Sequence, residues 1–187
     1  MNLNKERMPN RGAYGSRWHG FQVNLLHGLK DLCDKFLTQD SSVIELGCHL
    51  GISTRLFCSY AKKVTAVDII ANQSILMLEK ELENLDFVHS NNTEYLNKCS
   101  ANKELYDMVY IDANHSYPSV IEDIRNASKV LKSGGIMSGH DMLTDSENGV
   151  LRAVTEFNPK ISTGEVVLHR FSDSSWAFIH ESNNENI

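Results

Sequence analysis

Residues 45–53 have the composition of a loop that holds a nucleotide-like ligand. The segment lies between an apolar run that predicts a strand and a periodic run that predicts a helix, and it contains Gly47 and Gly51. Glycines at such positions permit a tight turn and let a ligand approach the N-terminus of the helix closely. Asp68 stands at the end of the next predicted strand, where a carboxylate can accept hydrogen bonds from both hydroxyls of a ribose. We therefore predict a cofactor loop, with an ordinary strand–helix turn as the alternative.

The spacing of the two glycines discriminates between cofactors. Loops that bind dinucleotides have the pattern G-x-G-x-x-G, in which the middle glycine lets the backbone meet a pyrophosphate. Here the pattern is G-x-x-x-G, and His49 stands at the middle position. A pyrophosphate would crowd the imidazole, whereas a ligand with adenosine but no phosphate would not. The loop favours S-adenosylmethionine, and His49 argues against a nicotinamide cofactor.

A second set of polar residues follows two later predicted strands. Asp112 and His115 come after one strand, and His140 and Asp141 come after the next. The carboxyl ends of neighbouring parallel strands open into one crevice, so we expect the two segments to face each other. Asp112, His140 and Asp141 then offer oxygen and nitrogen ligands to a divalent cation. The alternative for both aspartates is helix capping or hydrogen bonding within the loops.

His115 is a candidate general base. A neutral imidazole near pH 7 can take the proton of a hydroxyl group. Asp112 lies three residues earlier and could simply orient the ring. A lone histidine is more often structural, and the place of His115 in the predicted crevice favours the catalytic role.

The elements around these motifs alternate between strand and helix, which predicts a parallel sheet with helices on both faces. The expected strands are 43–46, 64–67, 87–89, 108–111 and 136–138, and the expected helices are 21–38, 52–60, 75–82, 94–98 and 116–131. Gly134 and Gly135 are expected to break the last of these helices. A further helix at 150–157 precedes two strands, 165–169 and 176–180, that predict an antiparallel hairpin with a turn at 172–175.

The composition limits the class of protein. A chain of 187 residues with 41% hydrophobic and 22% charged residues is expected to form one domain with its own core. The net charge of −6 disfavours a dedicated nucleic-acid binder, although the first 20 residues carry four basic side chains and one acid. The four cysteines form no C-x-x-C pair and are expected to be reduced. Without a membrane-length apolar run or a signal-peptide core, we expect a soluble cytoplasmic protein with no membrane partner.

With these motifs in this order, the sequence resembles the class I S-adenosylmethionine-dependent methyltransferases. The matching stretches, in the family's order, are 43–54, 66–69, 87–96, 106–124 and 134–142, followed by 149–157 and 176–179. The resemblance implies an α/β, Rossmann-like, doubly wound sheet of seven mostly parallel strands with a C-terminal antiparallel hairpin. It also implies cofactor contacts from Glu45, Gly47, Cys48, Gly51, Ser53, Asp68, Ile69, Asn91, Asn92 and Asp112. The family often has an acid in the loop after strand three, where this chain has the two asparagines.

The crevice residues are similar to those of the metal-dependent O-methyltransferases of the catechol and caffeoyl-CoA type. In that group an acid after strand four and an acid-led pair after strand five hold magnesium. This chain has His140 in place of the first acid of the pair and His115 at the position of the family's lysine base. Small bacterial methyltransferases with a G-H-D ending on strand five share both departures. A histidine ligand softens the site and admits manganese, zinc or iron.

The predicted function is methyl transfer from S-adenosylmethionine to a hydroxyl of a small molecule. Asp112, His140 and Asp141 would hold magnesium or manganese, and His115 would remove the hydroxyl proton, with Asp112 beside it. A metal-independent N- or O-methyltransferase and a non-catalytic S-adenosylmethionine-binding module are the alternatives. We expect residues 1–40 to shape the substrate region, 41–182 to bind the cofactor and 183–187 to form a polar tail. A homo-oligomer is compatible with these predictions.

Overall fold

The computed structural model of the protein describes residues 19–142 and 149–181. Its strands are β1 Ser42–Leu46, β2 Lys63–Asp68, β3 Leu85–His89, β4 Tyr106–Ile111, β5 Leu131–Gly139, β6 His169–Arg170 and β7 Trp176–Ile179. Its helices are α1 His19–Phe36, α2 Ile52–Tyr60, α3 Gln73–Glu81, α4 Asn92–Ala101, α5 Tyr117–Ala127, α6 Val150–Phe157 and α7 Lys160–Thr163. The basic arm predicted at the N-terminus and the polar tail at 183–187 lie outside the described residues.

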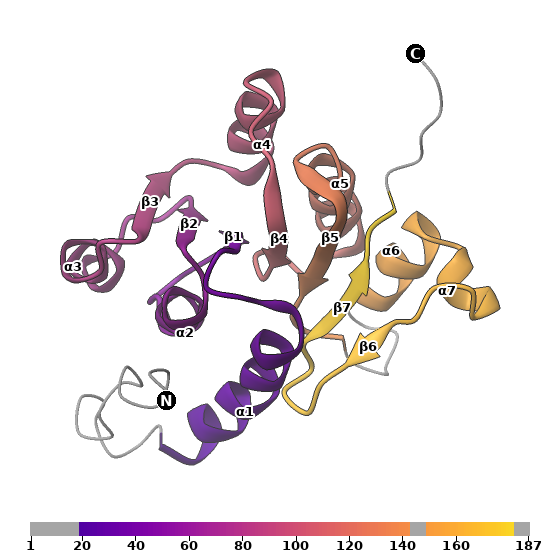
Figure 1. The fold of residues 1–187 in the computed structure, drawn as a ribbon, viewed down its shortest axis with the longest axis horizontal. Coiled ribbons are helices and arrows are strands. Elements are labelled where there is room, and N and C mark those ends of the chain that lie inside the picture. Colours follow the sequence, from indigo (N-terminus) through magenta and orange to yellow (C-terminus); the bar gives the residue numbers. More distant parts are fainter. Residues whose placement is uncertain (1–18, 143–148, 182–187) are drawn as a thin grey trace.

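The seven strands form one sheet in the order β3-β2-β1-β4-β5-β7-β6 (Figure 1). Strands β1 to β5 pair in parallel, whereas β7 runs antiparallel to both β5 and β6. The predicted doubly wound, seven-stranded sheet with a C-terminal antiparallel hairpin is confirmed. The strand order reverses between β1 and β4, and ligands of such sheets bind at the carboxyl ends of the strands around that reversal.

The central strands are buried on both faces, which explains their nearly continuous apolar sequences. Successive residues of β1 point to opposite faces, so Val43 packs among α1, α2 and α3, while Ile44 packs among α4, α5 and α6. Figure 1 shows these two groups of helices on opposite sides of the sheet. Helix α1 belongs to the first group through Leu32, which is fully buried.

The prediction that one helix extends to residue 131 was wrong. Helix α5 ends at Ala127, and Leu131 already begins β5 opposite Tyr106. The side chain of Leu131 is buried in the same core as the apolar side chains of α5. The helical spacing of apolar residues therefore continues past the end of the helix, although Leu131 itself is a strand residue. Gly134 and Gly135 therefore do not end a helix; they lie within β5, where the register shifts against β4 and Gly134 has φ +75°.

The hairpin was predicted correctly in kind but not in its bounds. Strand β6 is only His169–Arg170, whereas a strand over 165–169 was expected. Pairing is confined to His169 opposite Ala177 and Arg170 opposite Trp176. The apolar residues just before it do not join this ladder, and Val167 is 63% exposed. The short helix α7 was not predicted.

Two further expectations concern the cysteines and the membrane. Cys33, Cys48, Cys58 and Cys99 are all free and buried, which confirms unpaired thiols. Among the described residues, no helix combines the length and the apolar character that crossing a bilayer requires.

Candidate functional site

The loop from β1 to α2 is built from left-handed backbone. Gly47, His49 and Gly51 have φ values of +90°, +44° and +79°. A Cβ at Gly47 would stand 2.4 Å from the carbonyl oxygen of Asp112, so only glycine lets the end of β1 pass this close to the end of β4. At Gly51 a Cβ would come 2.8 Å from Cδ2 of Leu78 on α3. Close packing against backbone therefore requires glycine at position 47, and the left-handed backbone favours glycine at both positions.

Asp68, at the end of β2, holds this loop in place. Its Oδ2 accepts the backbone N–H of His49 at 2.8 Å, and its Oδ1 accepts that of Ile70 at 2.9 Å. Asn72 donates its side-chain amide to the carbonyl oxygen of His49. A carboxylate oxygen has a second lone pair, so Asp68 can still accept hydrogen bonds from a ribose.

Glu45 lies under the loop with its side chain 0% exposed. Its carboxylate accepts hydrogen bonds from the hydroxyls of Ser53 and Thr54, the latter at 2.5 Å. Burial raises the pKa of Glu45 to about 7, although these two hydrogen bonds oppose the shift. Ser53 lines a cavity and Glu45 does not, so in the structure Glu45 reaches that cavity through Ser53. A direct contact between Glu45 and the cofactor stays a prediction.

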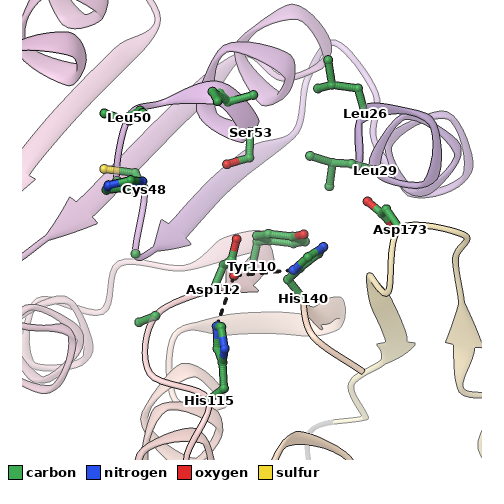
Figure 2. A pocket seen from close by; sticks show the side chains of 14 residues that line it. Leu26, Leu29, Cys48, Leu50, Ser53, Tyr110, Asp112, His115, His140 and Asp173 are labelled. Atoms are coloured by element: carbon green, nitrogen blue, oxygen red, sulfur yellow. Dashed lines mark ion pairs between the residues drawn. The ribbon is translucent and has the colours of Figure 1, made fainter. Parts of the chain in front are cut away.

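Two cavities lie at the carboxyl ends of the strands, and they share Gly47, His49, Asp112 and Ala113. The larger, of about 690 Å³, is hereafter called the adenosine cavity, because Asp68, Asn91 and Asn92, the predicted contacts of the ribose and the adenine, line it together with Ile69. The smaller, of about 420 Å³, is hereafter called the acceptor cavity, because the predicted base His115 lines it (Figure 2); its lining also includes Cys48, Ser53, Asp112 and His140. The predicted cofactor residues thus surround two adjoining halves of one crevice, except Glu45 and Gly51, which line neither.

Two of the three predicted metal ligands, Asp112 and Asp141, converge, but the third member of their group is the predicted base His115 and not the predicted ligand His140. Asp112, His115 and Asp141 each offer a ligand atom, and these atoms lie within 4.8 Å of one another. Oδ2 of Asp141 lies 2.9 Å from Nε2 of His115 and 3.1 Å from Nδ1 of His140. Oδ1 of Asp112 lies 3.6 Å and 3.8 Å from the same two nitrogens. The structure therefore groups two carboxylates with two imidazoles, where the sequence predicted one imidazole as ligand and the other as base.

This cluster is electrostatically coupled. Burial opposes a charge on His140, but the hydrogen bond to Asp141 and the charges of Asp112, Asp141 and Asp173 together raise its pKa to about 9. The contact with Asp112, and then the charge of Asp141, raise the pKa of His115. The hydrogen bond from His140 lowers the pKa of Asp141. The donor set of carboxylate oxygens and imidazole nitrogens fits a divalent cation, which would replace protons on these groups.

Comparison with known proteins decides the family. Residues 44–142, more than half of the chain, match the family model described as a methyltransferase domain. The chain belongs to this family. The matched segment runs from β1 to three residues past the end of β5, so it contains the glycine loop, Asp68, Asp112 and Asp141. No curated protein matches the sequence of the methyltransferase.

Solved structures share the fold of this methyltransferase at low sequence identity. MycE methyltransferase from the mycinamycin biosynthetic pathway, in complex with Mg and SAH, aligns with a TM-score of 0.64 and 16% identity over 86% of this chain and 50% of that one. This chain thus spans about half the length of MycE. An rRNA methylase from Streptococcus thermophilus aligns with a TM-score of 0.58 and 17% identity, covering 83% and 95% of the two chains. Fibrillarin from Methanococcus jannaschii, a pre-rRNA processing protein, has a TM-score of 0.57 and 18% identity over 77% and 68%.

Asp173 is a residue of the methyltransferase's acceptor cavity that sequence analysis missed. It lies in the turn between β6 and β7, and its carboxylate accepts the backbone N–H and the hydroxyl of Ser175, each at 2.9 Å. The Tyr110 hydroxyl lies 2.9 Å from the same Ser175 oxygen. Gly28 of α1 makes room for this turn, because a Cβ there would stand 2.2 Å from Oδ1 of Asp173. Nothing in the sequence distinguishes this aspartate from an ordinary turn residue.

The remaining wall of the acceptor cavity is apolar. Leu26 and Leu29 reach it from α1, and Leu50 and Ile52 reach it from the glycine loop and the start of α2. Figure 2 shows the two α1 leucines facing the polar centre formed by Tyr110, Asp112 and His140. Among the described residues that line either cavity, none is lysine or arginine. This cavity therefore has an apolar wall on one side and hydrogen-bonding groups on the other.

Proposed function

We propose that this protein transfers the methyl group of S-adenosylmethionine to a hydroxyl group of a small, uncharged molecule. The observation that supports this most directly is the adjacency of the two cavities across Gly47 and Asp112. A cofactor whose adenosine occupies one cavity would present its methyl group at the boundary with the other. MycE, which shares the fold, is described in complex with Mg, SAH and mycinamycin VI, and this supports a small-molecule acceptor.

The chain's own residues supply most of the proposed chemistry. Nδ1 of His115 accepts the proton of the acceptor hydroxyl, while Nε2 donates its hydrogen to Oδ2 of Asp141, 2.9 Å away, and this contact holds the imidazole in place. The methyl–sulfur bond breaks as the methyl–oxygen bond forms, and the electron pair stays on sulfur. Positioning by the glycine loop and the cavity walls contributes much of the rate of such a displacement. A divalent cation held by Asp112, His140 and Asp141 would lower the pKa of the acceptor hydroxyl.

The lining of the cavities favours a neutral acceptor. Asp112 and Asp173 supply negative charge to the acceptor cavity, and its described lining has no lysine or arginine to bind an anionic substrate. The two histidines of the lining, His115 and His140, already face the carboxylates of Asp112 and Asp141. The apolar side chains of Leu26, Leu29 and Leu50 suit the hydrophobic face of a sugar or a phenol. This lining and the overall charge of −6 argue against RNA as the acceptor, although two proteins of similar fold are named for rRNA.

The ion pair between His115 and Asp141 also supports a second candidate, a metal-independent O-methyltransferase. An imidazole held by a carboxylate 2.9 Å away can serve as a general base without a cation. Both candidates use the same cofactor and the same cavities. They differ only in whether a cation is required.

A transfer assay tests these proposals. The protein is incubated with S-adenosylmethionine and a panel of neutral sugars and phenols, and S-adenosylhomocysteine is measured by mass spectrometry. Loss of transfer in EDTA and recovery with MnCl₂ would support the metal-dependent reaction, whereas transfer that survives EDTA would establish the second candidate. Tight binding of S-adenosylhomocysteine without transfer to any acceptor would instead indicate a non-catalytic binding module. Failure to bind S-adenosylhomocysteine in calorimetry would overturn all three.

A further inference from the structure

The acceptor cavity contains a buried carboxylate that has no role in the proposed transfer. Asp173 lines this cavity from the turn between β6 and β7 and is 7% exposed. Its two oxygens accept hydrogen bonds from the backbone N–H and the hydroxyl of Ser175. The charge of Asp173 helps to raise the pKa of His140, yet within the described part of the chain no ion pair joins the two.

The hydrogen bonds around Asp173 leave it able to bind a further donor. A carboxylate is costly to bury unless donors surround it. Ser175 donates its only hydroxyl hydrogen to Asp173, so the hydroxyl of Tyr110, 2.9 Å away, must donate to Ser175. Both buried hydroxyls are therefore used within the protein. Each oxygen of Asp173 has accepted one hydrogen bond and can accept a second from a donor in the cavity.

Strand register places Asp173 at one end of a row of site residues. The strand ends that meet at this edge of the sheet are aligned with one another: Ile111 of β4, Gly139 of β5 and Trp176 of β7. His115 follows the first of these strands, His140 follows the second, and Asp173 precedes the third. Figure 2 shows His140 between the other two side chains. The proposed base and Asp173 therefore lie two strands apart.

This separation limits the molecules that can contact both groups. Adjacent strands of a sheet lie about 4.8 Å apart, so two steps across the sheet separate His115 from Asp173 by about 10 Å. A hydrogen bond takes up about 2.8 Å at each end, which leaves about 4–5 Å between the two oxygens of the ligand. Hydroxyls on neighbouring carbons of a six-membered ring lie closer together than this. Hydroxyls in 1,3 or 1,4 positions of such a ring have about the required spacing.

We propose that Asp173 selects acceptors with a second hydroxyl in the 1,3 or 1,4 position of a six-membered ring, relative to the hydroxyl that is methylated. The carboxylate accepts a hydrogen bond from this second hydroxyl, and the apolar face of the ring packs on Leu26 and Leu29. This assignment rests on the proposed function and narrows its acceptors to polyhydroxylated rings such as sugars. An acceptor with a single hydroxyl leaves Asp173 buried without the additional donor.

A substitution of Asp173 could also act through the fold alone, because the turn that carries it packs against Gly28 of α1. Ring compounds that differ only in the presence or position of one hydroxyl separate the two roles. The ratio of their affinities reports on recognition of that hydroxyl. A general loosening of the cavity weakens all of them and leaves the ratio unchanged.

The experiment is a ligand-observed NMR titration of the full chain, saturated with S-adenosyl-L-homocysteine, with cyclohexanol and with trans-1,2-, cis-1,3- and trans-1,4-cyclohexanediol. At least one of the 1,3 and 1,4 diols should bind roughly tenfold more tightly than cyclohexanol and the 1,2 diol, as for a hydrogen bond to a charged group. In Asp173→Asn and Asp173→Ala this preference should fall to within about threefold. The matched control is Leu26→Ala, which shortens the apolar wall and should weaken all the compounds alike.

The outcomes separate this inference from the proposed function. Equal binding of cyclohexanol and the diols, tightest binding of the 1,2 diol, or binding of none would overturn the role of Asp173 and leave the cofactor class intact. An unchanged preference in folded Asp173→Asn, with folding checked by thermal melting, would do the same. If neither Asp173 variant folds, the preference of the unsubstituted chain among the diols decides. Failure to bind S-adenosyl-L-homocysteine would overturn the proposed function and the inference together.

Discussion

Oδ2 of Asp141 lies 2.9 Å from Nε2 of His115, and this contact joins the end of β5 to the loop after β4. The same oxygen lies 3.1 Å from Nδ1 of His140, so one carboxylate holds two imidazoles. Asp141 occupies this place with φ +58°, a left-handed backbone that aspartate and asparagine tolerate better than most residues. Asp141 therefore lies closer to both imidazoles than Asp112, whose Oδ1 is 3.6 Å and 3.8 Å from the same nitrogens.

Asp141→Asn is expected to weaken Mn²⁺ binding by roughly ten- to a hundredfold, because it removes the charge but keeps the left-handed backbone. Affinity for S-adenosylhomocysteine should stay within about twofold, since Asp141 does not line the adenosine cavity. Both affinities are measured by titration calorimetry. Wild-type Mn²⁺ affinity in the folded variant would remove Asp141 from the proposed metal site.

Asp68→Ala is expected to weaken binding of S-adenosylhomocysteine by at least tenfold. The variant loses the ribose acceptor and also releases the backbone N–H groups of His49 and Ile70. The matched control is Asp86→Asn on the neighbouring strand β3, where an exposed carboxylate pairs with Lys63 at 2.9 Å outside both cavities. Equal affinities for the two variants would contradict the assignment of Asp68 to the ribose.

Gly47→Ala is expected to destabilise the fold by more than Gly134→Ala, although the two glycines have similar positive φ values of +90° and +75°. At Gly134 nothing lies within 4 Å of an added Cβ, so alanine there carries only the backbone cost of about 1–2 kcal/mol. At Gly47 the added Cβ would stand 2.4 Å from the carbonyl oxygen of Asp112 and must push β1 from β4. Urea denaturation measures the free energy of unfolding of both variants. Equal losses of stability would show that a Cβ at position 47 can be accommodated beside the carbonyl oxygen of Asp112.

Glu45→Gln is expected to change how stability depends on pH. The pKa of Glu45 is about 7 in the folded protein against an ordinary 4.5, so the folded state favours the protonated form. This contribution is fully present below about pH 4.5 and is lost as the pH rises through about 7, a change on the order of 3 kcal/mol. Glutamine cannot ionise, so the variant should gain stability relative to the wild type between pH 5 and 8. The free energy of unfolding of both proteins is measured by urea denaturation across this range. The same pH dependence in the two proteins would show that Glu45 does not ionise there.

Much of the fold was predictable because its signals are local. The buried strands β1, β2 and β4 are short apolar runs, and the glycine loop and the acid at the end of β2 mark the cofactor side. The end of α5 was mispredicted because Leu131 continues the helical period as a strand residue. The short β6 was mispredicted because an apolar run does not reveal whether a neighbouring strand is long enough to pair with it.

The candidate site, like the fold, was predictable from the sequence only in part. The sequence alone determined that Asp112, His115, His140 and Asp141 would meet, because a parallel sheet brings the carboxyl ends of its strands to one edge. It could not determine that one oxygen of Asp141 contacts both imidazoles, that Asp173 enters the acceptor cavity beside Gly28, or that Asp123 lines the adenosine cavity from α5. These contacts join residues from different helices and turns, and their distances depend on how the helices pack on the sheet. Residue type and spacing therefore identify the chemistry at the strand ends, whereas only the packed structure decides which side chains complete the two cavities.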